Sequence, residues 1–213
     1  LLEVNGQAML KRSINILKDN GIEDVAVVVG YKQDVIKRAL SDKINFIINP
    51  FYKQCNNMGS LWFAKSFVSG EPFVYLHGDL IYDRELLSDT LSEFNTRNND
   101  LELVTDYGPA DEEAMKVSVD SNNFLIESNK EIDLKKSAGE WTGIAYVNCS
   151  VDLFKYIEQI MLSGELNVYD TYAFTRMAQV GFKVYCSSTR GKPWIEIDFM
   201  EDYKKAQRMF SNE

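Results

Sequence analysis

The chain has 213 residues, of which 45% are hydrophobic and 12% aromatic, and this is enough for one domain with a sizeable core. A net charge of −9 with scattered lysines and arginines excludes nucleic acid as the main partner, because phosphate backbones require a basic surface. No apolar run approaches the roughly 18 residues of a membrane span, and no signal peptide is visible. Cys55, Cys149 and Cys186 lie far apart, so we expect reduced thiols in a cytoplasmic protein with no membrane partner.

The first half of the chain predicts helices that alternate with strands. Met9, Ile14 and Leu17 recur at helical spacing, and Gly21 stands where a left-handed C-cap belongs. Helices are expected at 7–20, 32–40, 84–94 and from residue 60, and strands at 24–30, 44–49 and 72–77. Such alternation is typical of a parallel sheet with right-handed crossovers.

The second half predicts strands that are joined by tighter turns, with a hairpin loop at 120–123. Strands are expected at 101–107, 116–128, 142–148 and 182–186, and helices at 151–162, 168–180 and 199–210. The pattern predicts a single α/β domain over 1–213, in which a doubly wound half precedes a mixed half.

The beginning of the chain has no methionine and reads as an internal connection. The first expected strand contains the unbroken apolar run "VAVVV", which is typical of a strand with neighbours on both sides. We therefore expect a further strand before residue 1.

Three acidic residues follow predicted strands and are candidate metal ligands. Asp79 follows the strand at 72–77, and Glu196 and Asp198 lie in "WIEID" before the last helix. Ligands of open α/β sheets bind beyond the carboxyl ends of strands, and Mg²⁺ takes carboxylate and phosphate oxygens. The alternative is that these residues are helix caps or turn residues, which aspartate also favours.

Nucleophilic catalysis has no support in the sequence. The only histidine, His77, ends a predicted strand and is more typical of a packed or hydrogen-bonded side chain, and Cys55 has no histidine to activate it. Chemistry must therefore rest on positioning and electrostatics, which suits phosphoryl and nucleotidyl transfer.

Two further stretches have both a functional and a structural interpretation. The loop that contains Asn49, Gln54, Asn56, Asn57 and Ser60 leads into a helix N-terminus, a place that accepts phosphate oxygens, but it also suits a capping loop. The pair Glu140 and Trp141 suits a cationic group, but it equally suits a surface acid beside a core tryptophan.

Several segments together resemble one family. "LLEVNGQAMLKRSINILKDNGIEDVAVVVGYK" closely resembles the sugar-nucleotide-type nucleotidyltransferases, in the part that follows their phosphate-binding loop. "NNMGSLWFAK", "HGDLIYD", "EWTGIAYVN", "SGELNVYDTYAF" and "IEIDFMEDYKKA" resemble the bacterial phosphocholine and phosphonate cytidylyltransferases. The resemblance implies a Rossmann-like mixed, mainly parallel sheet flanked by helices. The family's first strand and Gly-rich phosphate loop have no counterpart here.

The resemblance also implies roles for single residues. Asp79 and Asp198 match aspartates that bind the catalytic Mg²⁺, with Glu196 beside them, and Lys116 matches a lysine that faces the phosphates. The residues that match the nucleotide site are Gly30, Tyr31, Gln54, Asn56, Asn57 and Ser60. Residues 1–100 would form the nucleotide-binding half and 101–213 the acceptor-binding half.

The function predicted in this way is Mg²⁺-dependent transfer of CMP from CTP to a small phosphomonoester or phosphonate, with release of pyrophosphate. We expect an ammonium-bearing acceptor such as phosphocholine or 2-aminoethylphosphonate. Its predicted site consists of Tyr82, Glu140, Trp141, Tyr169 and Asp170. A sugar-1-phosphate nucleotidyltransferase and a non-catalytic nucleotide-binding module are the alternatives; CTP against UTP, and a homodimer, stay open.

Overall fold

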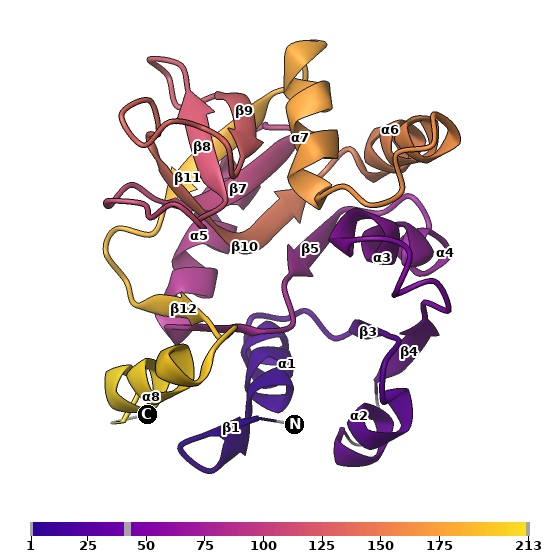
Figure 1. The fold of residues 1–213 in the computed structure, drawn as a ribbon, viewed down its shortest axis with the longest axis vertical. Helices are drawn as coiled ribbons and strands as arrows, with labels where there is room; N and C mark the ends of the chain where they lie inside the picture. Colours follow the sequence, from indigo (N-terminus) through magenta and orange to yellow (C-terminus); the bar gives the residue numbers. More distant parts are fainter. Residues whose placement is uncertain (1, 41–43, 212–213) are drawn as a thin grey trace.

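The structure, a computed structural model, describes residues 2–40 and 44–211 (Figure 1). Its helices are α1 (Met9–Asp19), α2 (Gln33–Ala39), α3 (Asn57–Phe63), α4 (Lys65–Val68), α5 (Arg84–Thr96), α6 (Ser150–Leu162), α7 (Asp170–Gln179) and α8 (Met200–Met209). Its strands are β1 (Glu3–Val4), β2 (Gln7–Ala8), β3 (Ala26–Val29), β4 (Asn45–Ile48), β5 (Phe73–Leu76), β6 (Leu80–Tyr82), β7 (Leu101–Asp106), β8 (Lys116–Val119), β9 (Leu125–Asn129), β10 (Gly139–Val147), β11 (Val184–Ser188) and β12 (Trp194–Glu196). None of these helices is long and apolar enough to cross a membrane.

The helices and strands expected from the sequence are confirmed, with shifted ends. α3 begins at Asn57, before the expected residue 60, because the side chain of Asn56 accepts a hydrogen bond from the Asn57 backbone and caps the helix. Gly21 adopts the expected positive φ after α1. The short strands β1, β2 and β6 were not expected. The strand expected before residue 1 lies outside the described residues.

The main sheet is mixed and largely antiparallel, so the expectation of a mainly parallel sheet is wrong. Its strand order is β11-β7-β10-β8-β9, and β5 also pairs with β10. Among the described strands of this sheet only β11 and β7 run parallel, whereas β10 is antiparallel to β5, β7 and β8. The alternation of helices and strands in the first half predicted that these strands run parallel to one another in one sheet. Within the described part of the chain, however, β5 pairs with the distant β10, and β3 pairs only with β4.

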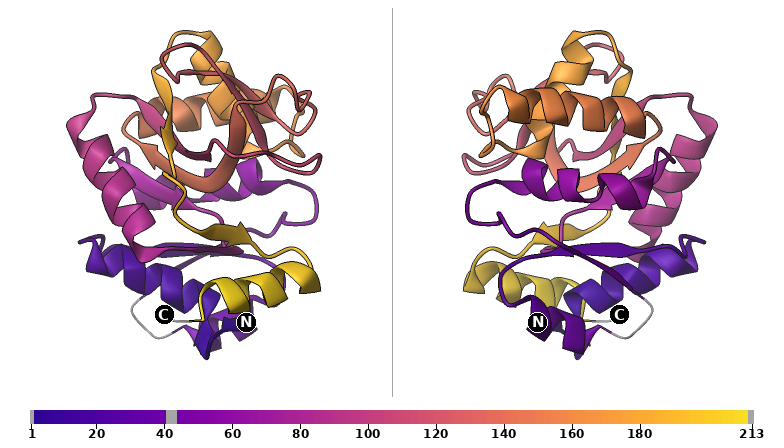
Figure 2. Two further views of the ribbon diagram at one scale, coloured as in Figure 1. Left: turned by 90° about the vertical axis from the view of Figure 1, so that its left-hand side faces the viewer. Right: turned by 90° about the vertical axis from the view of Figure 1, so that its right-hand side faces the viewer.

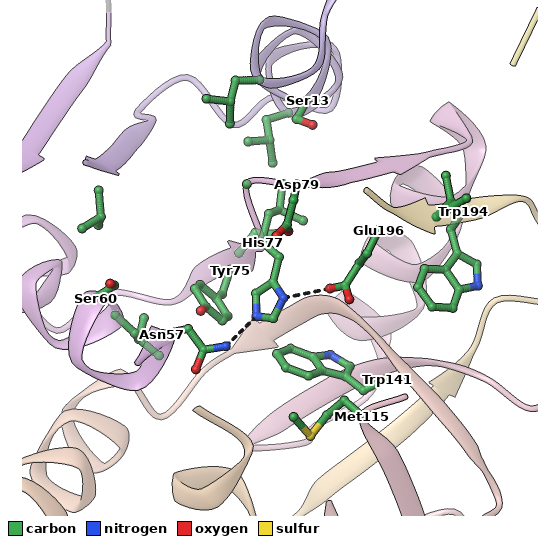
Figure 3. Close-up of a pocket in the computed structure, with 18 of the residues that line it drawn as sticks. Ser13, Asn57, Ser60, Tyr75, His77, Asp79, Met115, Trp141, Trp194 and Glu196 are labelled. Atoms are coloured by element: carbon green, nitrogen blue, oxygen red, sulfur yellow. Dashed lines mark hydrogen bonds and ion pairs between the residues drawn. The ribbon is translucent and has the colours of Figure 1, made fainter. Parts of the chain in front are cut away.

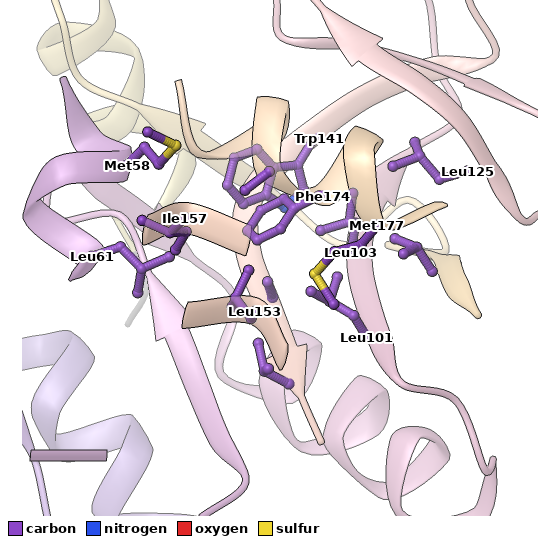
Figure 4. Close-up of a cluster of buried hydrophobic side chains, with 14 of the residues drawn as sticks. Met58, Leu61, Leu101, Leu103, Leu125, Trp141, Leu153, Ile157, Phe174 and Met177 are labelled. Carbon is purple, nitrogen blue, oxygen red and sulfur yellow. The ribbon is translucent and has the colours of Figure 1, made fainter. Parts of the chain in front are cut away.

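Helices cover both faces of this sheet (Figures 1 and 2). Successive residues of β10 point to opposite faces. Ala145 and Val147 therefore pack with α3, α6 and α7, whereas Ile144 and Tyr146 pack with α1 and α5. Figure 4 shows the first of these clusters, in which Trp141 and Phe174 lie between the helices and the sheet.

A second, small sheet brings two distant segments together near the candidate acids. β12 pairs antiparallel with β6, with Glu196 opposite Leu80, and the backbone N–H of Ile197 donates to the carbonyl of Asp79 over 3.0 Å. Apolar side chains of β6, β12 and α8 form a third buried cluster beneath it. This pairing fixes the C-terminal acids beside the end of β5.

Candidate active site

A cleft of about 1750 Å³ runs between β3, the end of β5, the end of β12 and the loop that precedes β8. Acidic side chains greatly outnumber basic ones in its lining, where the basic ones are Lys130, Lys192 and Lys205. Of these, Lys192 is paired with Glu85 and Asp89 on α5. The cleft is therefore suited to a cation or to a ligand that brings its own metal ion.

One group of side chains in the cleft brings potential metal-ligand atoms close together. Ligand atoms of His77, Asp79 and Glu196 all lie within 4.8 Å of one another (Figure 3). Asp79 and Glu196 supply carboxylate oxygens, which are the ligands of Mg²⁺, so the donor set fits this ion. Asp198 lines the same cleft but is not part of the group. The sequence paired Asp79 chiefly with Asp198, and the structure places Glu196 beside it instead, because the β6–β12 pairing carries Glu196 to the end of β5.

His77 lies at the centre of a buried polar network. Its Nδ1 is 3.0 Å from Oε1 of Glu196, and its Nε2 is 3.0 Å from Oδ2 of Asp170. The side-chain amide nitrogen of Asn57 is 3.3 Å from the same Nε2. Burial disfavours the charged ring, but the carboxylates of Asp170 and then Glu196 outweigh it and raise the pKa of His77 to about 10.

Asp170 is an internal anchor. Its side chain is fully buried, and it accepts hydrogen bonds from the Tyr75 hydroxyl and from the backbone of Thr171, each over 2.8 Å. Its own backbone N–H donates to Oδ1 of Asn57. Asp170 does not line the cleft, and its contact with the acceptor stays a prediction.

The residues of the asparagine-rich loop have two kinds of position: some stabilise the loop itself, and others line the cleft. Asn49 is buried and donates to the Ser60 hydroxyl over 3.1 Å, as a capping loop requires. Asn56, Asn57 and Ser60 line the cleft, as a nucleotide site would require. The other three predicted nucleotide residues, Gly30, Tyr31 and Gln54, lie outside its lining. The ring of Tyr31 is 63% exposed beside Tyr52.

The predicted acceptor residues are only partly brought together. Glu140, Trp141 and Tyr169 line the cleft, whereas Tyr82 is fully buried in the core and cannot contact a ligand there. Burial, followed by the charges of Asp111, Glu196 and Asp106, raises the pKa of Glu140 to about 7. The ring of Tyr169 already faces a cation, because Lys130 Nζ lies 5.7 Å from its centroid.

The side chain of Lys116 is buried and binds the backbone of the loop that precedes it. Its ammonium group donates to the backbone carbonyls of Asp111, Glu112 and Ala114 over 2.8–3.4 Å. The residue is buried and does not line the cleft. In this arrangement Lys116 holds the loop that carries Asp111 into the cleft, and its place facing the phosphates stays a prediction.

Sequence reasoning missed the central position of His77 and the part played by Gly143. Gly143 has φ +82°, and a Cβ there would lie 3.0 Å from His77 Nδ1 and 3.1 Å from Glu196 Oε1. The backbone N–H of His77 donates to the Gly143 carbonyl over 3.0 Å. A glycine inside a strand segment marks a bulge or a close approach, and this was the available signal.

Comparison with known proteins finds a matching family model and several relatives. The model of the MobA-like NTP transferase domain matches residues 1–157. CTP:phosphoglutamine cytidylyltransferase of Campylobacter jejuni is 23% identical, over 95% of this chain and 88% of that protein. Choline-phosphate cytidylyltransferase of Streptococcus pneumoniae is 24% identical, over 100% of this chain and 89% of that protein. The structure of the inositol-1-phosphate CTP transferase from T. maritima superposes with a TM-score of 0.80 at 19% identity, covering 99% and 86% of the two chains, which shows a shared fold.

Proposed function

The chain belongs to the MobA-like NTP transferase family and is thus a nucleotidyltransferase, and we propose that it transfers CMP from CTP to a small phosphomonoester or phosphonate that carries an ammonium group. An oxygen of the acceptor's phosphate or phosphonate attacks the α-phosphorus of CTP. A new P–O bond forms, the bond to the β-phosphate oxygen breaks, and pyrophosphate leaves.

Asp79 and Glu196 are the residues that would hold Mg²⁺, with Asp198 close by in the same cleft. When bound, Mg²⁺ neutralises charge on the phosphates of both substrates. The chain's own contribution is position: β6 and β12 hold the two acids at a fixed separation, and Asn56, Asn57 and Ser60 offer polar groups along the cleft wall. Positioning of this kind can account for most of the catalysis in nucleotidyl transfer.

The observation that carries the choice of acceptor is the acidic corner around Glu140. Asp106 and Asp111 line the cleft near it and contribute to its raised pKa. A cationic group bound there relieves the repulsion between these carboxylates, and Trp141, although almost fully buried, belongs to the same wall. A neutral sugar gives no such relief. We place the ammonium group at Glu140 and not at Tyr169, because Lys130 occupies the face of Tyr169.

The names of the relatives support the same class of acceptor. Choline and glutamine both carry an ammonium group, and both are named as parts of the acceptors of matched cytidylyltransferases. A sugar or polyol phosphate is the competing class, and the inositol phosphate of the T. maritima structure belongs to it. The acidic corner favours the first class over the second.

The test is an assay of pyrophosphate release by the purified full chain with Mg²⁺ and either CTP or UTP. Phosphocholine and 2-aminoethylphosphonate should be turned over with CTP far faster than glucose-1-phosphate or inositol-1-phosphate. Equal or faster turnover of the sugar phosphate would replace this proposal with the competing class. Absence of turnover with every acceptor would favour a non-catalytic nucleotide-binding module.

The metal site is tested by charge-neutral substitution. Asp79→Asn and Asp198→Asn should each abolish pyrophosphate release while the protein stays folded. Asp19→Asn is the matched control, because Asp19 is an exposed acid that pairs with Arg84 on the surface. Near-normal turnover in Asp79→Asn or Asp198→Asn would show that this aspartate does not bind the metal ion and is only a turn residue.

A further inference from the structure

The imidazole of His77 joins two carboxylates that come from different parts of the chain. Asp170 is the first residue of α7, and Glu196 is the last residue of β12. Each carboxylate lies 3.0 Å from one of the two ring nitrogens. The edge of the ring contacts Trp141, with centroids 4.8 Å apart at 73°. Figure 3 shows the ring between Asn57 and Glu196.

The two carboxylates differ in how firmly they are held. Asp170 is fully buried and accepts two further hydrogen bonds, from Tyr75 and Thr171. The side chain of Glu196 is 33% exposed and faces the cleft. A chain of hydrogen bonds from a fixed group to a mobile one restricts the mobile one. His77 therefore transfers the rigidity of Asp170 to Glu196.

The same contacts leave Glu196 free to bind a metal ion and exclude His77 from doing so. Nδ1 of His77 engages Oε1 of Glu196, and Oε2 keeps its lone pairs. Both ring nitrogens of His77 face carboxylate oxygens at 3.0 Å, so in this arrangement these oxygens block the approach of a cation to either nitrogen. The absence of a side chain at Gly143 leaves room for the ring in this place.

We propose that His77 is a positioning residue, which orients the Glu196 carboxylate for a divalent cation shared with Asp79 and couples it to the start of α7. The inference rests on the proposed function, since it concerns the same metal site. Hydrogen-bond partners of metal ligands typically contribute about 10–100-fold to metal affinity. His77→Gln should therefore weaken divalent-cation binding by about tenfold or more although the residue is not a ligand.

The experiment uses Mn²⁺ as the probe and the full chain without an acceptor. Free Mn²⁺ is measured by its EPR signal, with and without CTP, for the wild type, His77→Gln, Glu196→Gln and the double variant. His77→Gln should raise the Kd for Mn²⁺ about tenfold in the wild type and less than about twofold when Glu196 is already glutamine, because coupled residues are not additive. Electron spin echo modulation of the wild type should show no coordinated histidine nitrogen.

Controls separate this role from a general loss of stability. Thr90→Val removes a buried hydrogen bond to Tyr146 away from the cleft and should leave the Kd unchanged. If His77→Gln does not fold, Asp170→Asn weakens the same connection from its other end and should raise the Kd in the same way.

Four results would overturn the proposal: a coordinated histidine nitrogen in the wild type, additive effects in the double variant, an unchanged Kd in His77→Gln, or a wild type that binds no Mn²⁺ even with CTP. The readout is independent of turnover. A chain that binds Mn²⁺ as described but transfers no CMP would refute the proposed function and leave this inference standing.

Discussion

Gly143 lies where the main strand β10 meets the metal site. The pairing of β10 with β7 is irregular between Trp141 and Ala145, and Gly143 adopts φ +82° in that interval. A methyl group added there would lie 3.0 Å from the His77 ring and 3.1 Å from Glu196. Gly143→Ala therefore strains the backbone and also displaces the contact between His77 and Glu196.

Gly164→Ala is the matched control that measures the stability cost of placing alanine at a positive φ, without the contact with His77 and Glu196. Gly164 has φ +95°, and a Cβ there would meet nothing within 4 Å. Placing alanine in a left-handed conformation costs about 1–2 kcal/mol. Since 1 kcal/mol lowers Tm by about 2–4 °C in a chain of this size, Gly164→Ala should lose about 2–8 °C with its activity intact.

Gly143→Ala should lose at least as much Tm and should also lose function. The ring of His77 and the carboxylate of Glu196 must each move by a few tenths of an ångström, which disturbs the metal ligand. We expect kcat to fall about tenfold or more, a loss typical for a disturbed partner of a metal ligand, with part of it recovered at high Mg²⁺. Thermal unfolding and steady-state kinetics at two Mg²⁺ concentrations measure both effects. Equal Tm loss in the two variants with normal kcat in Gly143→Ala would refute the reasoning.

Two further predictions concern single charges. Because folding raises the pKa of Glu140 from 4.5 to about 7, the folded chain holds a proton between these values that the unfolded chain has released, and stability falls as the pH rises through this window. Glu140→Gln should therefore reduce the difference in the free energy of unfolding between pH 5 and pH 8, as measured by urea unfolding. The same difference in the variant and the wild type would count against the acidic corner around Glu140. Lys116→Met leaves three loop carbonyls without their donor and should cost about 1–3 kcal/mol of stability in urea. If Lys116→Met instead loses as much kcat as Asp79→Asn, Lys116 contacts the substrate phosphates and its role is not only structural.

Local pattern predicted the elements well because helical spacing and caps are local properties. α5, for example, begins at the expected residue, where Asp83 caps it. The direction of the sheet could not be predicted, because pairing with β10 is decided by the packing of residues far apart in the chain.

The candidate site shows the same division. Asp79 and Glu196 were predicted from strand ends, and the structure brings them together. The burial of Tyr82 and Asp170 could not be predicted, because composition alone does not tell on which side of a chain segment a side chain lies. His77 was read as a hydrogen-bonded residue, which is confirmed, but its two partners come from segments that only the fold makes neighbours.

The long strand β10 also determines the order in which the chain can fold. β5 finds its partner only when residues 144–147 are available, and β6 only when residues 194–196 are. A growing chain therefore exposes the edges of both strands until these distant segments have been made, and pairing across such separations is slow. The two halves of the sequence share their hydrogen-bonded strands, so neither can complete its sheet without the other.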